Sequence, residues 1–248
     1  MATPTPTTSE RIVEAALKLF NEHGFQNVPA LRIAMHLGIS PGHLAYHFKS
    51  KNDIVMAVLP QLERMLRESK RPDEPFLPHN AALQQIEVYR TLWKYRFFFN
   101  ALTQLLPQDA ELRERYRVLQ DAAIAALQDL FDELIAQGFM RPAVAPNSTR
   151  MLANSCWMMW LSWLRFEQIE NPSREIPHPQ ALYDAVMLNF SIIQPYFSDE
   201  FWAQELDALK KLLFEEAAAA GPRKRKTARP VGAKSGAAAS PRRRQREG

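Results

Sequence analysis

Apolar residues recur at intervals of three and four along most of this 248-residue chain, and few stretches alternate with the period of a β-strand. The first periodic segment follows Thr7 and Glu10, which have the spacing of a helix capping box, and Gly24 supplies a left-handed stop for it. This pattern predicts an all-α protein in which helices follow one another from near the N-terminus.

Turn-forming residues divide the next stretch into shorter helices. Pro29 suits the first turn of a second helix that Gly38 ends, and Ser40 with Pro41 suits the start of a third. A Ser-x-x-Asp cap at residues 50–53 opens a fourth helix. After the proline-rich segment 71–80, we expect helices near residues 79–95, 96–106, 109–137, 147–170, 179–195 and 199–219.

The stretch GISPGHLAYHFKSKND, residues 38–53, carries polar side chains at high density directly after a chain-reversing glycine. Two short helices joined by a tight glycine turn are typical of the helix-turn-helix, whose second helix enters the DNA major groove. Ile39 and Leu44 are apolar where this arrangement must pack inward. The residues left for double-stranded DNA are Ser40, Pro41, Gly42, His43, Tyr46 and His47, with Lys49 and Lys51 where phosphates would pass. For this stretch alone, ordinary turn chemistry is the alternative interpretation.

A longer segment favours the DNA-binding interpretation. ERIVEAALKLFNEHGFQNV, followed by IAMHLGISPGHLAYHFKSKNDI, resembles the N-terminal DNA-binding domain of the TetR/AcrR family of bacterial regulators. In the resemblance His47 and Lys51 match the family pattern, and His43 occupies a position that commonly contacts DNA. The chain departs from the pattern at Val28-Pro29, Leu31 and Ala45, where relatives often carry a hydroxyl, a basic residue and a tyrosine that reach phosphate.

The resemblance also implies that residues 71–220 form a variable all-helical domain that binds small molecules and forms a homodimer. This region is rich in aromatic residues, which either fill a core or line an apolar pocket. The candidates for binding a small-molecule effector are Tyr89, Trp93, Phe97, Phe98, Trp157 and Trp160, with Arg96 and Arg165 as polar anchors for an acidic ligand. For the dimer we favour helices 147–170 and 179–195, whose faces carry Trp157, Trp160, Trp163, Val186, Leu188 and Phe190.

Charge follows this organisation of the chain. The predicted parts are a flexible N-terminus (1–8), a helix-turn-helix domain (9–55), a connecting helix (56–70), the sensing and dimerisation domain (71–220) and a disordered basic tail (221–248).

Residues 1–70 carry 8 basic and 6 acidic side chains, residues 71–220 carry 13 basic and 20 acidic ones, and residues 221–248 carry 10 basic and 1 acidic one. A flexible basic arm adds sequence-independent affinity for DNA by counterion release. The alternative is that the tail is a dispensable, solvated appendage.

Other chemistries find little support. Cys156 lies in the apolar stretch NSCWMMWLSW, which favours a buried small hydrophobe over a redox sensor. His43 and His47 have metal-ligand spacing, but no cysteine follows at zinc spacing, so we expect no metal. We find no catalytic constellation or phosphate loop and expect neither an enzyme nor a cofactor. The first ten residues lack the features of a secretory signal, and the uncharged run 151–164 is too short for a bilayer, so we expect a cytoplasmic protein without a membrane partner.

We therefore expect a homodimeric transcriptional regulator, a repressor that a small apolar or amphipathic ligand releases from a palindromic operator. One alternative is an architectural, largely sequence-independent DNA-binding protein that uses the basic tail. Another is a helical interaction module with a vestigial helix-turn-helix. A footprint distinguishes them, because the first predicts a short palindrome, the second unspecific coverage and the third no protection.

Overall fold

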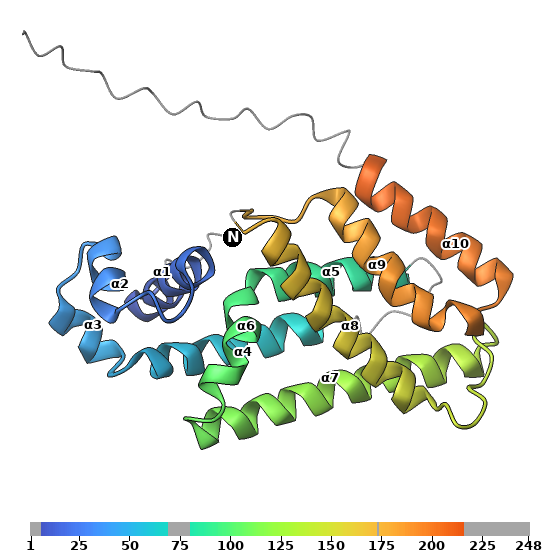
Figure 1. Ribbon diagram of the computed structural model, residues 1–248, viewed down its shortest axis with the longest axis horizontal. Helices are drawn as coiled ribbons and strands as arrows, with labels where there is room; N and C mark the ends of the chain where they lie inside the picture. The colour runs from blue at the N-terminus through green and yellow to red at the C-terminus, as the bar shows by residue number, and fades with distance from the viewer. Residues whose placement is uncertain (1–5, 69–79, 173, 216–248) are drawn as a thin grey trace, which may run out of the picture.

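The computed structural model describes residues 6–68, 80–172 and 174–215, most of which lie in helices (Figure 1). This described part holds ten α-helices, a short 3-10 turn and a π-helical turn, and its only β-bridge joins Met140 to Phe197. The all-α prediction is confirmed. None of the helices described is long and apolar enough to cross a membrane. The predicted tail at 221–248 and residues 71–79 of the predicted loop lie outside the described residues.

A small N-terminal bundle contains three helices, α1 (Thr8–His23), α2 (Ala30–Leu37) and α3 (Pro41–His47). The predicted capping box opens α1, where the Glu10 N–H donates to Thr7 Oγ1 at 3.2 Å and the Thr7 N–H donates to Glu10 Oε2 at 2.7 Å. The inner face of α1 is buried, with Ile12, Ala16 and Phe20 at most 1% exposed. The bundle, which we call the head, therefore buries an apolar face, and this face belongs to the same core cluster as the buried residues of the later helices.

The fourth helix, α4 (Lys51–Glu68), leads from the head into the rest of the molecule. Its predicted cap is present, because the Asp53 N–H donates to Ser50 Oγ at 3.2 Å and the Ser50 N–H donates to Asp53 Oδ2 at 3.0 Å. The helix continues through Pro60, which is exposed. It also runs across the predicted boundary between residues 55 and 56, so the head and the connecting segment share one helix.

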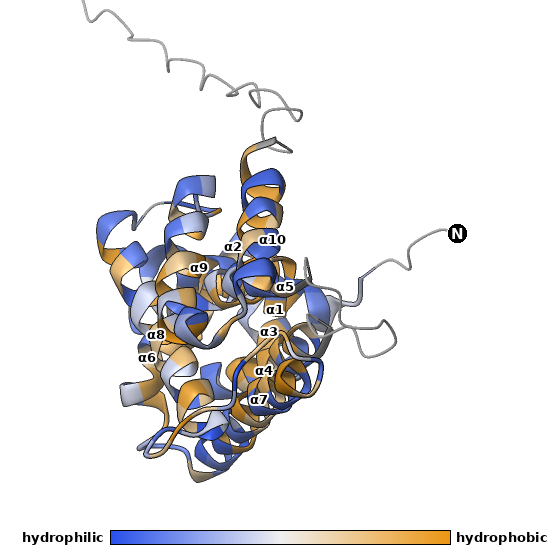
Figure 2. Cartoon of the chain, turned by 90° about the vertical axis from the view of Figure 1, so that its right-hand side faces the viewer, coloured by the Kyte–Doolittle hydropathy of each residue, from blue (hydrophilic) through white to orange (hydrophobic). Residues whose placement is uncertain are grey.

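Six further helices form the C-terminal domain: α5 (Asn80–Lys94), α6 (Arg96–Leu105), α7 (Ala110–Ala136), α8 (Thr149–Glu170), α9 (Pro179–Ile193) and α10 (Asp199–Lys210). The first five end within two residues of their predicted bounds. The helix α10 gives way to the π-helical turn Lys211–Glu215, and its predicted end at residue 219 lies outside the described residues. The helix α8 packs against α7 on one side and α9 on the other. In Figure 2 most helices show one hydrophilic and one hydrophobic face.

The exposed face of α8 differs from the one we predicted. Five of the six proposed dimer residues, Trp157, Trp160, Trp163, Val186 and Phe190, are at most 6% exposed within a single subunit. Leu188 is 49% exposed. The exposed apolar residues of α8 are instead Met151, Met158, Phe166 and Ile169. Because α8 carries large apolar side chains around its whole circumference, the sequence pattern did not indicate which face turns inward.

Candidate nucleic-acid interface

The turn between α2 and α3 is built by Gly38 and Ser40. Gly38 adopts the left-handed conformation, with φ of 67° and ψ of 28°, and the next N–H, of Ile39, donates to the Ala34 carbonyl at 3.0 Å. Ser40 Oγ then accepts the His43 N–H at 3.1 Å, and Pro41 occupies the first helical position. The third helix therefore begins at the residue that the sequence predicted.

One face of α3 is anchored and the other is open. Leu44 and Phe48 pack into the core of the head and are only 4% and 8% exposed. On the opposite face, Ser40, Pro41, Gly42, His43 and Tyr46 are exposed, whereas His47 is half-buried. At 85%, Tyr46 is the most exposed of the large hydrophobic side chains in the described part of the chain. Its ring contributes little to the packing of the head and is therefore accessible to a binding partner.

Glycine at position 42 is not required by the fold. Its φ lies in the ordinary range, and a Cβ atom added there would meet only Ser40 Oγ, at 4.0 Å. A missing side chain on the open face of α3 instead leaves room for another backbone to approach closely. A contact between Gly42 and DNA stays a prediction.

Three rings line up along the open face of α3. The ring centroids of His43 and His47 lie 5.4 Å apart, and those of Tyr46 and His47 lie 5.3 Å apart. Within the described residues, no group of three or more His, Cys, Asp or Glu side chains is placed to hold a metal ion. The rings offer hydrogen-bonding and stacking groups at a surface, which are the groups that read base edges and contact the DNA backbone.

The two lysines after α3 have different surroundings. Lys49 is exposed. Lys51 is half-buried, its ammonium donates to the Phe25 carbonyl at 2.9 Å, and it lies 4.2 Å from the centroid of the Phe25 ring. Burial lowers the pKa of this ammonium. Lys51 therefore joins α4 to the segment after α1, a structural role that the sequence did not indicate, whereas Lys49 is free to face a phosphate.

The helix α2 adds residues that sequence reasoning missed. Arg32 is exposed beside α3, and its Nη2 lies 2.9 Å from His23 Nε2 at the end of α1. Leu31 and Met35 are 54% and 72% exposed on the same helix. Relatives often carry a basic residue near Leu31, where this chain departs from the pattern, and Arg32 is the immediate neighbour of Leu31. We include Arg32 among the candidate contacts to the DNA backbone.

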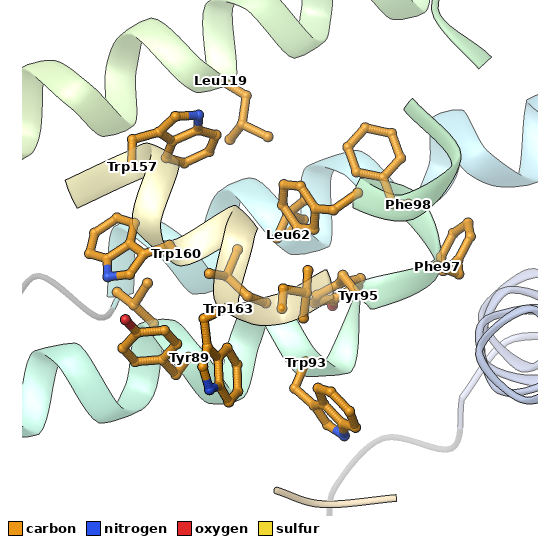
Figure 3. Close-up of a cluster of buried hydrophobic side chains, with 14 of the residues drawn as sticks. Leu62, Tyr89, Trp93, Tyr95, Phe97, Phe98, Leu119, Trp157, Trp160 and Trp163 are labelled. Atoms are coloured by element: carbon orange, nitrogen blue, oxygen red, sulfur yellow. The ribbon is translucent and has the colours of Figure 1, made fainter. Parts of the chain in front are cut away.

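The predicted effector-binding residues are mostly brought together. Tyr89, Trp93, Phe97, Phe98, Trp157 and Trp160 are buried, and Figure 3 shows them where α5, α6 and α8 meet. The rings of Tyr89 and Trp163 lie 4.7 Å apart, and those of Trp157 and Trp160 lie 6.3 Å apart. Arg165 is exposed and is therefore not placed with this cluster.

The polar atoms of the aromatic cluster are largely used by the fold. The Tyr89 hydroxyl donates to the Ala185 carbonyl at 2.7 Å, and Trp160 Nε1 donates to Gln85 Oε1 at 2.9 Å. Trp93 Nε1 donates to the Glu175 carbonyl at 3.1 Å. Trp157 Nε1 is buried beside the Tyr116 hydroxyl of α7, where burial raises the Tyr116 pKa while this contact lowers it.

Two further groups of this region were singled out in the sequence. Arg96 is buried with its guanidinium 4.7 Å from the centroid of the Trp93 ring, and its Nη1 donates to the Trp93 carbonyl at 2.9 Å. Burial lowers the pKa of Arg96, and Glu22 and Glu175 act in the opposite direction. Cys156 is fully buried, and burial raises the pKa of its thiol to about 12. It has the surroundings of a small hydrophobe rather than of a reactive thiol.

Comparison with known proteins agrees with this geometry. A family model described as bacterial regulatory proteins of the tetR family matches residues 12–58, and one described as a bacterial transcriptional repressor, TetR, matches residues 60–204. An anchored α3 after a glycine turn, followed by a larger helical domain, defines a helix-turn-helix DNA-binding transcriptional regulator. The chain belongs to the TetR family. Members of this family are transcription factors rather than enzymes, in agreement with our expectation.

Curated relatives match mainly the N-terminal part. The HTH-type transcriptional regulator UidR of Escherichia coli K12 is 37% identical over 75 residues, which cover 30% of this chain and 38% of UidR. The HTH-type transcriptional regulator SAB2452 of Staphylococcus aureus is 48% identical over 50 residues, 20% of this chain and 27% of that protein. The match thus spans well under half of either relative.

Solved structures match the whole fold. A TetR-family transcriptional regulator from Marinobacter aquaeolei VT8 is 26% identical, with a TM-score of 0.73 over 83% of this chain and 98% of that one. The regulator PfmR from Thermus thermophilus is 23% identical, with a TM-score of 0.57 over 77% of this chain and 97% of that one. The two-domain helical fold is therefore shared along most of the described chain.

Proposed function

We propose that the protein is a homodimeric repressor that binds a palindromic operator through α3 and leaves it when a small ligand binds the C-terminal domain. The observation that carries the proposal is the open face of α3, which is fixed to the head by Leu44 and Phe48. In this proposal His43 reads base edges. The remaining contacts to bases and backbone come from Ser40, Pro41, Gly42, Tyr46, His47, Lys49 and Arg32, with Lys51 at the edge of the interface.

The exposed face of α8 supports the homodimer. Met158, Phe166 and Ile169 are 67–68% exposed, Met151 is 50% exposed, and their spacing places them along one side of the helix. Leu188 on the neighbouring α9 is 49% exposed. A row of exposed large apolar side chains marks an interaction surface, and a second copy related by a two-fold axis presents the same row. We call Met151, Met158, Phe166, Ile169 and Leu188 the α8–α9 stripe.

The aromatic cluster beneath this stripe supports ligand sensing. Rings from α5, α6 and α8 offer an apolar surface. We propose an apolar or amphipathic effector that binds against these rings. With Arg165 exposed and Arg96 hydrogen-bonded to the Trp93 carbonyl, we no longer propose an arginine anchor for an acidic ligand. The effector acts only to the extent that it binds one conformation of the dimer better than the other.

The alternative function remains an architectural DNA-binding protein that uses the basic tail. The ten basic residues of 221–248 favour it, because they bind DNA without regard to sequence. Genome-wide mapping of the binding sites in bacterial cells distinguishes the repressor from the architectural protein. The mapping is done once with the full chain and once with a chain truncated after Ala220. We expect both chains to occupy the same few sites, all containing one palindrome, with the truncated chain binding more weakly. Even coverage of the genome that disappears on truncation would support the architectural function instead.

A further inference from the structure

The junction between α5 and α6 is completed by a side chain from the head. The helix α5 ends at Lys94 and α6 begins at Arg96, and α6 has no side-chain cap of its own. Asn21 of α1 supplies it, because the Phe97 N–H donates to Asn21 Oδ1 at 3.0 Å and Asn21 Nδ2 donates to the Lys94 carbonyl at 2.8 Å. One amide thereby satisfies an acceptor at the end of one helix and a donor at the start of the next.

Other contacts hold α6 along α1. The rings of Phe20 and Phe97 lie 5.1 Å apart, and in Figure 3 Phe97 extends toward α1 whereas Phe98 extends away from it. At the other end of α6, Gln26 Nε2 donates to Gln104 Oε1 at 2.9 Å. The glutamine contact is exposed and joins two flexible side chains, so it restrains little. Asn21 differs because both of its partners are backbone groups.

The junction that Asn21 caps rests on α8 from the other side. Trp93, one residue before Lys94, lies with its ring centroid 6.1 Å from that of Trp163 on α8. Its Nε1 donates to the Glu175 carbonyl in the segment that leads from α8 to α9. Asn21 is therefore joined, through a short series of contacts, to the two helices that carry the α8–α9 stripe.

We infer that Asn21 is a positioning residue for operator recognition, one that fixes the orientation of each head on the dimer and so sets the spacing of the half-sites. The inference rests on the proposed function. One inserted base pair rotates one half-site relative to the other by about 35°, since the duplex turns once in about 10 base pairs. A dimer whose heads are held rigidly binds tightly only to an operator with one spacing of its half-sites. A dimer whose heads have lost the Asn21 contact can reorient them to fit a rotated half-site.

A spacing series tests this role. The palindrome selected by the wild-type protein is prepared with its natural spacing and with one or two base pairs inserted or removed, and binding is followed by fluorescence anisotropy. We call the ratio of the affinity for the natural spacing to that for an altered spacing the spacing penalty. For Asn21→Ala we expect a spacing penalty about ten times smaller than that of the wild type, because each subunit loses two hydrogen bonds. The preference for half-site bases should be unchanged, because α3 is untouched.

The matched control is Asn27→Ala. Asn27 Nδ2 donates to the His23 carbonyl at 2.9 Å, which is also a bond from an asparagine to the end of a helix, but one that lies entirely within the head. This control should keep the spacing penalty of the wild type. If Asn21→Ala does not fold, Asn21→Ser serves in its place, because a shorter side chain cannot bridge both backbone groups.

A second readout follows the heads without DNA. Spin labels at Ala45→Cys, an exposed position on α3, report the distance between the two heads of a dimer. We expect a narrow distribution with Asn21 present and a broad one with Asn21→Ala. An unchanged spacing penalty and an unchanged distribution would overturn the role of Asn21. Failure of the wild-type protein to prefer any palindrome would instead refute the proposed function, and the two outcomes are therefore distinguishable.

Discussion

Lys49 and Lys51 are two residues apart, but their surroundings predict different consequences when each is removed. Lys49 is exposed, so Lys49→Ala should leave the free energy of unfolding unchanged and lower the slope of log affinity against log salt by about one. Lys51 bonds the Phe25 carbonyl and covers its ring, so Lys51→Ala should lower the free energy of unfolding by about 1–2 kcal/mol. Urea unfolding and a salt titration of operator binding measure both. Equal effects of the two substitutions on both quantities would contradict the distinction.

His43 is the residue that we expect to carry base recognition. It follows the Ser40 cap on the open face of α3, where a side chain reaches a base edge without disturbing the head. His43→Ala should cost about 1–3 kcal/mol of discrimination between the operator and altered operators, the typical worth of one good base contact. His36→Ala, an exposed histidine on α2, is the control and should retain discrimination. If the two variants discriminate equally well, α3 is not the reading element.

At the scale of elements, a carboxyl of α10 contacts the start of α5. Glu205 is fully buried, and its Oε2 accepts the Ala82 N–H at 2.7 Å. Burial raises the pKa of Glu205 from 4.5 to about 8, while its backbone hydrogen bonds act in the opposite direction. Between these two pKa values, the folded protein keeps a proton that the unfolded chain has released.

The stability of the C-terminal domain should therefore fall as the pH rises. The contribution of Glu205 is fully present below about pH 4.5 and is lost by about pH 8, with a steepest slope of about 1.4 kcal/mol per pH unit. Glu205→Gln keeps an acceptor for the Ala82 N–H and removes the titration, so its free energy of unfolding should vary less over this range. Urea unfolding at several pH values measures the difference. Parallel curves for the two proteins would show that Glu205 does not titrate there.

Helix ends were predictable because most of their signals are local. The predicted caps at Thr7, Ser40 and Ser50 each bond a backbone N–H three residues further on, so sequence spacing alone indicated these three helix starts. The structure shows the same local cap at Asp109, Ser148 and Ser198. Contacts between elements were not predictable in this way. Lys51 meets a partner 26 positions away and Asn21 one 76 positions away. The open face of α3 followed from a local motif, whereas the outward face of α8 required knowledge of which neighbours cover the other side.

At the scale of the whole molecule, we propose that the α8–α9 stripe forms the dimer interface. Phe166→Glu places a charge at the centre of a surface that, in a dimer, has no water to solvate it. We expect this variant to be a monomer at micromolar concentration in light scattering. It should keep its fold but no longer bind the palindromic operator. Val118→Glu on α7, where the valine is 60% exposed, is the matched control and should stay dimeric. A wild-type protein that is already monomeric would refute the proposed dimer.

Tethered DNA cleavage from α3 tests the central claim, that two copies of this helix bind two halves of one operator. The chain has a single cysteine, Cys156, which is fully buried with its thiol pKa raised to about 12, so Ala45→Cys provides the one reactive thiol for an iron chelate. On the selected operator we predict two clusters of cuts, related by the two-fold axis of the palindrome and about 10 base pairs or a multiple of that apart. Cuts spread evenly along the duplex, or a single cluster, would contradict the account.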